Sequence, residues 1–347
     1  MGDYFSVRWV DGVVKMLDQR LLPGEVVYRD FVQYEDVAHA IHQMVIRGAP
    51  AIGIAAGFGL ALCAFYSKAT QARELISQLN VAADVLRKSR PTAVNLFWAI
   101  DRILRTVNSI RDLDVSLIKQ MVVSEAQKIA EEDILMNKKI ASNGQRFVPD
   151  NANLFHHCNT GALATGGYGT ALGVIRSAHE SGKKIHVYVD ETRPRLQGAR
   201  LTSWELKQLG VPHTVIVDGA SGHFMRNTRI DACFVGCDRI ASNGDVANKI
   251  GTYNLALVAF AHGVPFYSVG PTSTIDLSIA CGEEIPIEER AGREITHVGD
   301  TQITPDNVQV ANPAFDITPA KFITAIITNA GVACPPYEES LAKLMNG

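Results

Sequence analysis

Several motifs that mark common classes of binding protein are missing from this sequence. It contains no CxxC or HExxH motif, which are the usual patterns for structural and catalytic zinc. Its most glycine-rich loop reads GGYGT, which is neither the GxGxxG motif of dinucleotide-binding folds nor a P-loop with its lysine. We therefore expect neither a bound nucleotide nor a metal ion, and no other cofactor.

The sequence also lacks a large charge of either sign. The formal net charge is only -3 for 347 residues. A balance this close to zero gives no general attraction to nucleic acid or to an acidic membrane surface. We expect no nucleic-acid or membrane partner, so that an anionic ligand would have to be bound by a few local basic groups.

Long hydrophobic runs and clustered cysteines are missing too. The longest apolar stretch, 49–65, is short and interrupted by glycines, so it predicts a buried helix rather than a membrane span. The opening segment MGDYFSVRWVDG has no apolar core of the kind found in signal peptides. Six cysteines scattered over a long chain do not form a secreted disulfide framework. A cytoplasmic protein is the expectation.

The apolar pattern changes near residue 145. Before it, the spacing of apolar residues predicts mostly helices, with short strands at 5–14 and 25–31. The expected helices are 34–46, 51–67, 71–88, 93–107 and 115–140. The segment 142–153 is rich in turn formers, and we place a domain boundary there. The prediction is a mostly helical domain over 1–145 and a second domain over 146–347.

The second domain is predicted to be a Rossmann-like α/β fold. Short runs that are apolar on both faces alternate with helical segments, as expected for a doubly wound parallel sheet covered by helices. The expected strands are 153–157, 185–189, 213–217, 232–235 and 266–269. Ligands of such sheets bind beyond the carboxyl ends of the strands. The candidate residues at those ends are Cys158, Asp190, Asp218, Asp238 and Gly270.

Two of these candidates carry acid/base chemistry. Cys158 ends a strand and enters a glycine-rich loop, where a thiol can act as a thiolate nucleophile or base. A zinc site formed with the two preceding histidines is the less favoured alternative, because adjacent strand residues point to opposite faces. Asp238 follows the run ACFV, and a carboxyl buried at that tip would suit general-acid work. The alternatives are a buried structural cysteine, and an aspartate that pairs with Arg239 or caps a helix.

Basic and polar residues at predicted turns supply candidate anion contacts. Arg47, Gly48 and Ala49 precede a glycine- and alanine-rich helix, and Arg90 precedes a proline that turns the chain out of a helix. Lys249 lies near the start of another predicted helix, where the helix dipole disfavours a cation unless an anion lies between them. Solvated arginines at ordinary helix junctions are the alternative explanation of the first two segments.

Taken together, these segments resemble the methylthioribose-1-phosphate isomerase family of the methionine salvage pathway. The resemblance runs from about residue 47 to 331. No single matching stretch identifies the family, but the combination of all of them does. The matching stretches are RGAPAIGIAAGFGLAL, SRPTAVNLFWAI, HCNTGALATGGYGTALGVIRSA, VYVDETRPRLQGARLTSWEL, GCDRIASNGDVANKIGTYNLA and NPAFDITPAKFITAIITNAG.

The resemblance implies a cofactor-free aldose-ketose isomerase that converts 5-methylthioribose 1-phosphate into 5-methylthioribulose 1-phosphate. It also implies a homodimer. The family pattern assigns Cys158 and Asp238 as the catalytic pair. It assigns substrate contacts to Arg47, Gly48, Ala49, Arg90, Gln197, Asn248 and Lys249. The wider superfamily leaves two alternatives open. One is an isomerase of ribose 1,5-bisphosphate or 5-deoxyribose 1-phosphate, and the other is a non-catalytic regulatory subunit of a translation initiation factor.

Overall fold

The chain forms two compact units. The computed structural model describes residues 4–91 and 93–346, and the residue contacts assign 4–135 and 162–169 to an N-terminal unit. Residues 136–161 and 170–346 form the C-terminal unit. The division expected at residue 145 from composition stays a prediction.

The N-terminal unit is mainly helical, as the sequence predicts. Its helices are α1 (Tyr34–His42), α2 (Ala49–Tyr66), α3 (Ala72–Ser89), α4 (Val94–Ser109) and the first part of α5 (Val115–Gly144). A small antiparallel sheet of β1 (Val7–Val10), β2 (Val13–Leu17) and β3 (Tyr28–Phe31) precedes them. The single strand expected at 5–14 is a hairpin, because Asp11 and Gly12 both adopt positive φ angles and reverse the chain.

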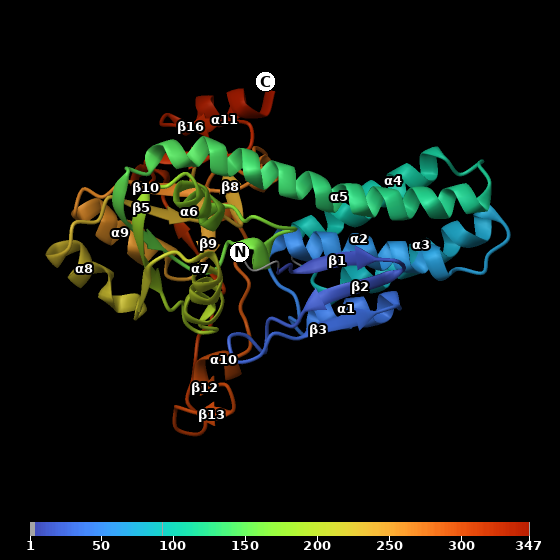
Figure 1. Cartoon of the computed structure of the whole chain (residues 1–347), viewed down its shortest axis with the longest axis horizontal. Coiled ribbons are helices and arrows are strands. Elements are labelled where there is room, and N and C mark those ends of the chain that lie inside the picture. Colours follow the sequence, from blue (N-terminus) through green and yellow to red (C-terminus); the bar gives the residue numbers. More distant parts are fainter. Residues whose placement is uncertain (1–3, 92, 347) are drawn as a thin grey trace. The chain divides into compact units, whose positions relative to one another are not determined.

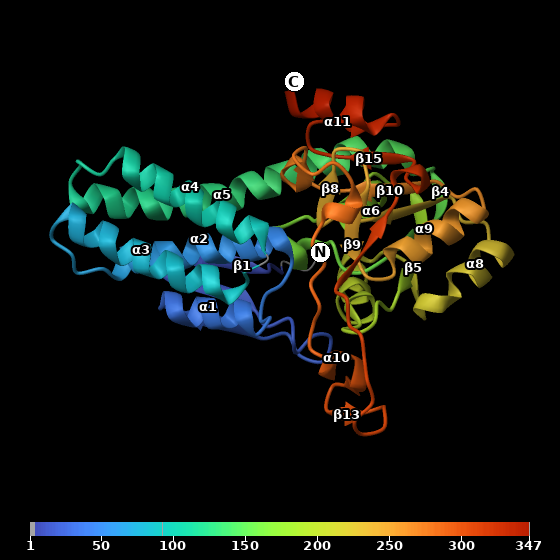
Figure 2. The same cartoon turned by 180° about the vertical axis from the view of Figure 1, so that it is seen from behind.

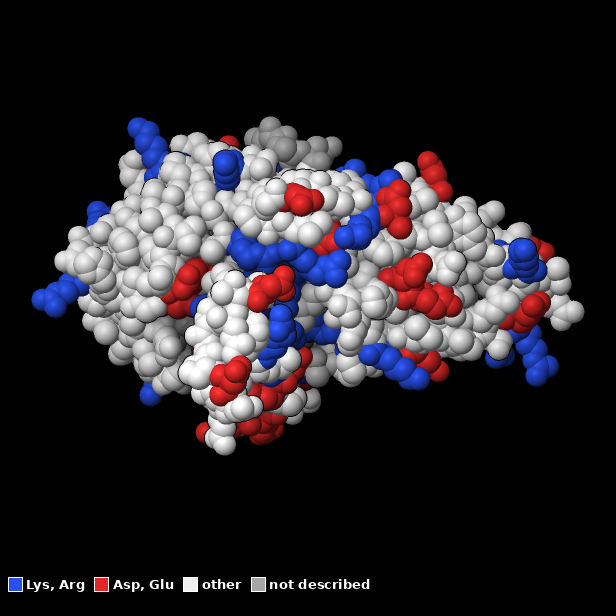
Figure 3. Space-filling view, turned by 90° about the horizontal axis from the view of Figure 1, so that it is seen from below, with Lys and Arg blue, Asp and Glu red and all other residues white. Residues whose placement is uncertain are grey.

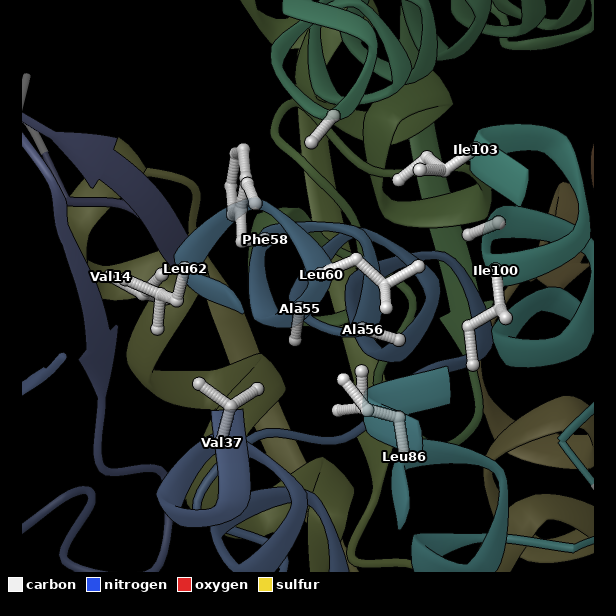
Figure 4. Packing of buried hydrophobic residues seen from close by; sticks show 14 of the residues in the cluster. Val14, Val37, Ala55, Ala56, Phe58, Leu60, Leu62, Leu86, Ile100 and Ile103 are labelled. Atoms are coloured by element: carbon white, nitrogen blue, oxygen red, sulfur yellow. The ribbon is translucent and has the colours of Figure 1, made fainter. Parts of the chain in front are cut away.

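Helix α2 forms the centre of this unit. Most of its residues are buried, and Figure 4 shows Ala55, Ala56, Leu60 and Leu62 of α2 among side chains of the surrounding elements. Glycine permits the close packing: a Cβ at Gly53 would lie 2.7 Å from the main-chain oxygen of Asn95 at the start of α4. In length and composition α2 also resembles a membrane span, but 72% of it is buried inside the protein, as in a core helix.

Residues 162–169 belong to the N-terminal unit although they follow the first strand of the other unit. Ser6 Oγ donates a hydrogen bond to the Thr165 carbonyl at 2.5 Å, and Gln19 Nε2 donates to the Leu163 carbonyl at 2.7 Å. The Gly166 N–H donates to Asp133 at 2.7 Å. This segment is therefore hydrogen-bonded to both the beginning and the end of the 4–135 part of the N-terminal unit.

The C-terminal unit is built on a seven-stranded sheet in the order β16-β15-β10-β7-β4-β5-β6. All neighbouring strands are parallel except the β15–β16 pair. The strands are β4 (Asn151–His156), β5 (Lys184–Asp190), β6 (His213–Ile216), β7 (Ala232–Val235), β10 (Phe266–Val269), β15 (Ala325–Ile327) and β16 (Val332–Ala333). The predicted doubly wound parallel sheet is confirmed.

Helices cover both faces of this sheet, so its strands are buried on both sides (Figures 1 and 2). Along β4, Leu154 packs into the core on one face and Phe155 into the core on the other. The main helices are α6 (Ala171–Glu180), α7 (Ser203–Leu209), α8 (Ser221–Asn227), α9 (Thr252–Ala261) and α11 (Tyr337–Asn346). Acidic and basic side chains both occur on the face of the molecule in Figure 3, in keeping with the small net charge.

A second, four-stranded sheet lies in the same unit and was not predicted. Its order is β11-β8-β9-β14, with β11 (Ile275–Asp276), β8 (Arg239–Ala241), β9 (Val246–Lys249) and β14 (Phe315–Thr318). Beyond it an arm carries α10 (Arg293–Thr296) and the hairpin of β12 (His297–Val298) and β13 (Thr301–Gln302) (Figure 1). The strands of this sheet have two to four residues each, too few for a readable alternation.

Candidate active site

The two predicted catalytic residues follow neighbouring parallel strands. Strands β4 and β7 are hydrogen-bonded in parallel, with Phe155 opposite Cys233. From β4 the chain builds β5 and β6 on one side, and from β7 it builds β10 and β15 on the other. The β4–β7 pair is therefore the point at which the strand order reverses, where doubly wound folds bind their ligands. Cys158 follows β4 there, and Asp238 follows β7.

Close packing brings the loops after these strands together. A Cβ on Gly236, at the end of β7, would lie 2.7 Å from Cγ2 of Thr160 and 3.6 Å from Oδ1 of Asn248. Thr160 lies two residues after Cys158, and Asn248 belongs to β9. Glycine at 236 thus lets three loops meet, and they carry Cys158, Asp238 and the Asn248–Lys249 pair.

Cys158 is buried and held through its main chain and its thiol. Its φ angle is +66°, a conformation that non-glycine residues rarely adopt. Its N–H donates to Oγ1 of Thr192 at 2.9 Å, and its carbonyl accepts from Oγ1 of Thr202 at 2.6 Å. The thiol donates to Oε1 of Gln197 at 3.4 Å. The structure therefore brings two predicted site residues, Cys158 and Gln197, into direct contact.

Gln197 lies at the entry of a π-helical turn, Gly198–Thr202, that leads into α7. Turns of this kind are rare and frequently occur at functional sites. Only glycine fits at 198, because a Cβ there would lie 1.8 Å from the main-chain oxygen of Asp190. The segment that leads into α7 therefore begins with a π turn rather than a regular helical turn, at the point where the chain approaches the end of β5.

Asp238 differs from the sequence expectation in its burial. We expected a buried carboxyl at a strand tip, but Asp238 is exposed, since β7 ends at Val235 and the chain turns into β8. Its N–H donates to the Ala247 carbonyl at 2.8 Å, which joins it to β9. Arg239, suggested as its structural partner, forms an ion pair with Asp276 at 2.6 Å.

Asn248 is buried, and its Nδ2 donates to Oγ1 of Thr252 at 3.0 Å. The next residue, Lys249, is half-buried and donates to the Ala314 carbonyl at 3.0 Å. We had inferred an anion between Lys249 and the start of the following helix. That position is occupied by the protein itself, because Asp316 accepts the N–H groups of Gly251 and Tyr253 at 2.7 and 3.1 Å. The anionic partner at the start of α9 is thus a carboxylate of the protein, and a substrate contact of Lys249 stays a prediction.

The remaining predicted contacts, Arg47, Gly48, Ala49 and Arg90, belong to the N-terminal unit. Arg47 is buried, and Gly48 precedes α2 with a φ of +95°. A Cβ on Gly48 would lie 2.4 Å from the Ala164 carbonyl oxygen, so only glycine permits this approach of the 162–169 segment. Arg90 ends α3 with φ −149° and ψ 85°, the non-helical conformation expected before a proline.

Two buried histidines next to Cys158 were not predicted to contribute to the site. His156 Nδ1 lies 2.8 Å from the Phe234 carbonyl, and burial lowers the pKa of His156 to about 4, so its ring is neutral. His157 lies between Asp190 and the Ile250 carbonyl, 2.9 Å from each. Burial acts to lower the pKa of His157, but the hydrogen bond to Asp190 and the negative charges of Asp190 and Asp218 together outweigh it, so the pKa is raised. Burial likewise raises the pKa of Asp190.

Ligand atoms of His157, Asp190 and Asp218 lie within 4.8 Å of one another, the kind of grouping that can hold a cation. Hydrogen bonds already engage these groups. His157 Nδ1 bonds Asp190, and the two Asp218 oxygens accept the N–H groups of Thr192 and Arg193 at 2.7 and 2.8 Å. His157, Asp190 and Asp218 therefore form a hydrogen-bonded network that fixes the loops at the strand ends.

Comparison with known proteins agrees with this geometry. Residues 45–335 match the Initiation factor 2 subunit family. A methylthioribose-1-phosphate isomerase from Synechococcus sp. is 55% identical over 345 residues, which cover 99% of each chain. The chain belongs to the methylthioribose-1-phosphate isomerase family. The family membership that we inferred from the motifs is confirmed.

Two solved structures are similar over the whole chain. The 5-methylthioribose 1-phosphate isomerase from Pyrococcus horikoshii has a TM-score of 0.95 at 46% identity and covers 99% of this chain and 96% of its own. The translation initiation factor eIF-2B subunit delta from A. fulgidus has a TM-score of 0.92 at 42% identity, with 99% and 100% covered. The isomerase family therefore shares its fold closely with a protein assigned to translation.

Proposed function

We propose that this protein is a methylthioribose-1-phosphate isomerase of methionine salvage, an aldose-ketose isomerase that works without a cofactor. The observation that carries the proposal is the end-to-end similarity to relatives with that activity, at 55% identity. It is supported by the position of Cys158 and Asp238 after neighbouring strands at the switch point of the sheet.

The substrate sets a particular chemical problem. Phosphate on C1 blocks the anomeric carbon, so the sugar ring cannot open to a free aldehyde. In our mechanism Asp238 is the general acid that protonates the ring oxygen as the C1–O4 bond breaks. Asp238 is exposed in the free chain, and a bound substrate supplies the conditions for a neutral carboxyl, because lost water and a nearby phosphate charge both disfavour the carboxylate.

Cys158 moves the carbon-bound proton. As a thiolate it removes the proton from C2, which gives an enol with a C1–C2 double bond. The C2 hydroxyl then returns a proton to Asp238 while Cys158 gives its proton to C1, so the product is the 2-ketose. Each residue ends in the protonation state in which it began. The competing route is a direct hydride shift from C2 to C1, with both residues limited to oxygen-bound protons.

In this proposal the sugar phosphate is bound by the residues that the family pattern assigns to it, which are Arg47, Gly48, Ala49, Arg90, Gln197, Asn248 and Lys249. Gln197 already accepts a hydrogen bond from the Cys158 thiol. The three cations are sufficient for one phosphate group without a metal ion.

The test is turnover of purified protein with 5-methylthioribose 1-phosphate. Cys158→Ser and Asp238→Asn are each expected to lower kcat by about 10²- to 10⁴-fold, the range for a lost acid or base group. Circular dichroism melting checks that both variants remain folded. Cys334→Ser, which alters an exposed thiol, is the matched control and keeps normal turnover. Near-normal turnover of both site variants would refute the assignment of the pair.

Reaction in deuterated water distinguishes the two routes. Proton transfer through Cys158 predicts solvent deuterium at C1 of the product, detected by mass spectrometry. Substantial label at C1 excludes the hydride shift, which carries the C2 hydrogen across unchanged.

We further propose that the protein is a cytoplasmic homodimer. Its scattered free cysteines suit a reducing compartment. Sedimentation of the purified chain tests the dimer, and a monomer at micromolar concentration contradicts it.

Other functions remain as competitors. The 42% identity to an eIF-2B delta subunit favours a regulatory role in translation as the second candidate. That role predicts a stable hetero-oligomer, no turnover and no requirement for Cys158. A parallel assay with ribose 1,5-bisphosphate and 5-deoxyribose 1-phosphate tests the related isomerases, since the substituent at C5 is what separates the three substrates.

A further inference from the structure

We propose that Thr192, in the loop after β5, is a positioning residue for Cys158, because its hydroxyl oxygen accepts the main-chain N–H of that cysteine. The inference rests on the isomerase function proposed above, in which the Cys158 thiol moves the proton. Thr192 lies two residues beyond β5, is completely buried, and accepts the Cys158 N–H through its hydroxyl oxygen at 2.9 Å.

Both partners of this hydrogen bond have unusual backbones. The φ angle is +66° at Cys158 and +62° at Thr192. A β-branched residue at positive φ is a clear exception among protein structures, and such residues persist only where their surroundings hold them. Two left-handed residues from different strand ends are here bonded to each other, so the conformation of each supports that of the other.

Asp218 holds Thr192 in this conformation from the end of β6. One carboxylate oxygen accepts the Thr192 N–H at 2.7 Å, and the other accepts the N–H of Arg193 at 2.8 Å. The Thr192 hydroxyl in turn donates to the Asp190 carbonyl at 3.0 Å, which fixes the direction of its lone pairs toward Cys158. The ends of three strands, β4, β5 and β6, are thereby connected through one residue, whose hydroxyl bonds Cys158 and Asp190 and whose N–H bonds Asp218.

This arrangement decides where the thiol points. Thr192 fixes the N–H of Cys158 and Thr202 fixes its carbonyl, so the peptide groups on both sides of the residue are held. The side chain is left to reach Gln197, a proposed substrate contact, at 3.4 Å. A proton-transfer group must lie within hydrogen-bonding reach of the reacting atom, and a small displacement is costly in rate.

Two substitutions at one position separate the hydroxyl from the shape of the side chain. Thr192→Val keeps the β-branch and volume but removes the acceptor, which leaves the buried Cys158 N–H without its bond. We expect kcat to fall about 10- to 100-fold, as for a misplaced reacting group, while KM changes less than about twofold. Thr192→Ser keeps the hydroxyl and is expected to stay within about threefold of the normal kcat.

A second measurement reports on the thiol itself and does not depend on turnover. Iodoacetamide alkylation is followed by mass spectrometry for the peptide that contains Cys158, with the exposed Cys334 as an internal control. In Thr192→Val the loosened loop exposes the thiol, so the rate at Cys158 rises several-fold while the rate at Cys334 is unchanged. In Thr192→Ser both rates match the unaltered protein.

Controls cover general effects of the substitution and failure to fold. Thr106→Val removes a comparable hydroxyl bond, to the Arg102 carbonyl of α4, and leaves kcat and both alkylation rates unchanged. If Thr192→Val does not fold by circular dichroism, Asp218→Asn replaces it. This variant loses one of the two carboxylate oxygens that accept the N–H groups of Thr192 and Arg193. It is expected to show the same lower kcat and the same faster alkylation of Cys158.

The outcomes distinguish this inference from the proposed function. No turnover by the unaltered protein refutes the isomerase, and the alkylation rates then still test the link between Thr192 and Cys158. Normal kcat and normal alkylation in Thr192→Val overturn the positioning role. If Thr192→Ser is as impaired as Thr192→Val, the positioning role is also overturned. Serine keeps the hydroxyl group of threonine, so the loss of activity could not then be due to loss of that hydroxyl.

Discussion

The imidazole of His157 is hydrogen-bonded to two groups at once, the carboxyl of Asp190 and the main-chain oxygen of Ile250, each 2.9 Å away. A carbonyl oxygen cannot donate, so Nε2 carries a hydrogen. One further proton lies between Nδ1 and Asp190. The raised pKa values of both His157 and Asp190 agree that this pair retains that proton in the folded protein. Asp218 and Asp316 add negative charge near the ring.

Retention of this proton makes stability depend on pH. Since the pKa of His157 is raised above 6.5 by folding, its contribution to stability is fully present below that value and is lost as the pH rises through the folded pKa. Asp190→Asn removes the negative charge that favours protonated His157. The unfolding free energy of this variant should therefore fall less as the pH rises. Urea unfolding at a series of pH values from about 6 to 9 measures it. His262→Gln, at an exposed histidine, is the control, and an equally steep pH dependence in Asp190→Asn would contradict the prediction.

Gly198 is expected to tolerate no side chain. Alanine there would place a Cβ 1.8 Å from the Asp190 carbonyl oxygen, so the main chain must move. We expect Gly198→Ala to cost about 1–3 kcal/mol in unfolding free energy, as for an overpacked core, and to lower turnover through Gln197. Gly222→Ala in α8, whose Cβ would meet only Val258 at 3.8 Å, is the matched control. Urea titration should show it unchanged or slightly more stable.

Removal of the carboxyl group of Asp316 should weaken the start of α9. This group accepts two N–H groups of the first turn, and burial raises its pKa. Asp316→Ala is expected to lower the unfolding free energy by about 1–2 kcal/mol, the usual cost of a lost helix cap. Asp316→Asn keeps one acceptor oxygen and should cost less. If Asp316→Ala were as stable in urea as the unaltered protein, this contribution of the cap would be refuted.

Chelation should leave turnover unaffected. The His157, Asp190 and Asp218 atoms that could bind a cation are engaged with one another or with backbone N–H groups. Activity is therefore expected to be the same after dialysis against EDTA. Loss of activity under EDTA that zinc restores would instead assign these residues, or the His-His-Cys segment, to a metal site.

The parallel sheet could be predicted because its strands are short, apolar on both faces and separated by helices. The run ACFV, for instance, is buried at all four positions. The second sheet could not, since β8 and β9 are polar in part and β9 pairs with β14 more than sixty residues later. Local patterns carry no information about such long-range partners, and β15 was overlooked for the same reason.

The candidate site was predictable in its location but not in its supporting contacts. The rule for strand ends selects five candidates, and the family resemblance then assigns Cys158 and Asp238 as the catalytic pair. Thr192 gave no signal, because the need for its hydroxyl arises only from the left-handed conformation of Cys158. The exposure of Asp238 could not be predicted. It depends on how many residues lie between the end of β7 and the start of β8, and no sequence pattern marks that turn.

The excursion of residues 162–169 limits how this polypeptide can be dissected. Fragments made by one cut near residue 145 would separate Ser6, Gln19 and Asp133 from the acceptors and the donor that they bond in that segment. Neither fragment alone would then hold a full set of its own interactions. Co-expression of the two pieces, rather than either by itself, is the arrangement that should yield folded material by fragment complementation.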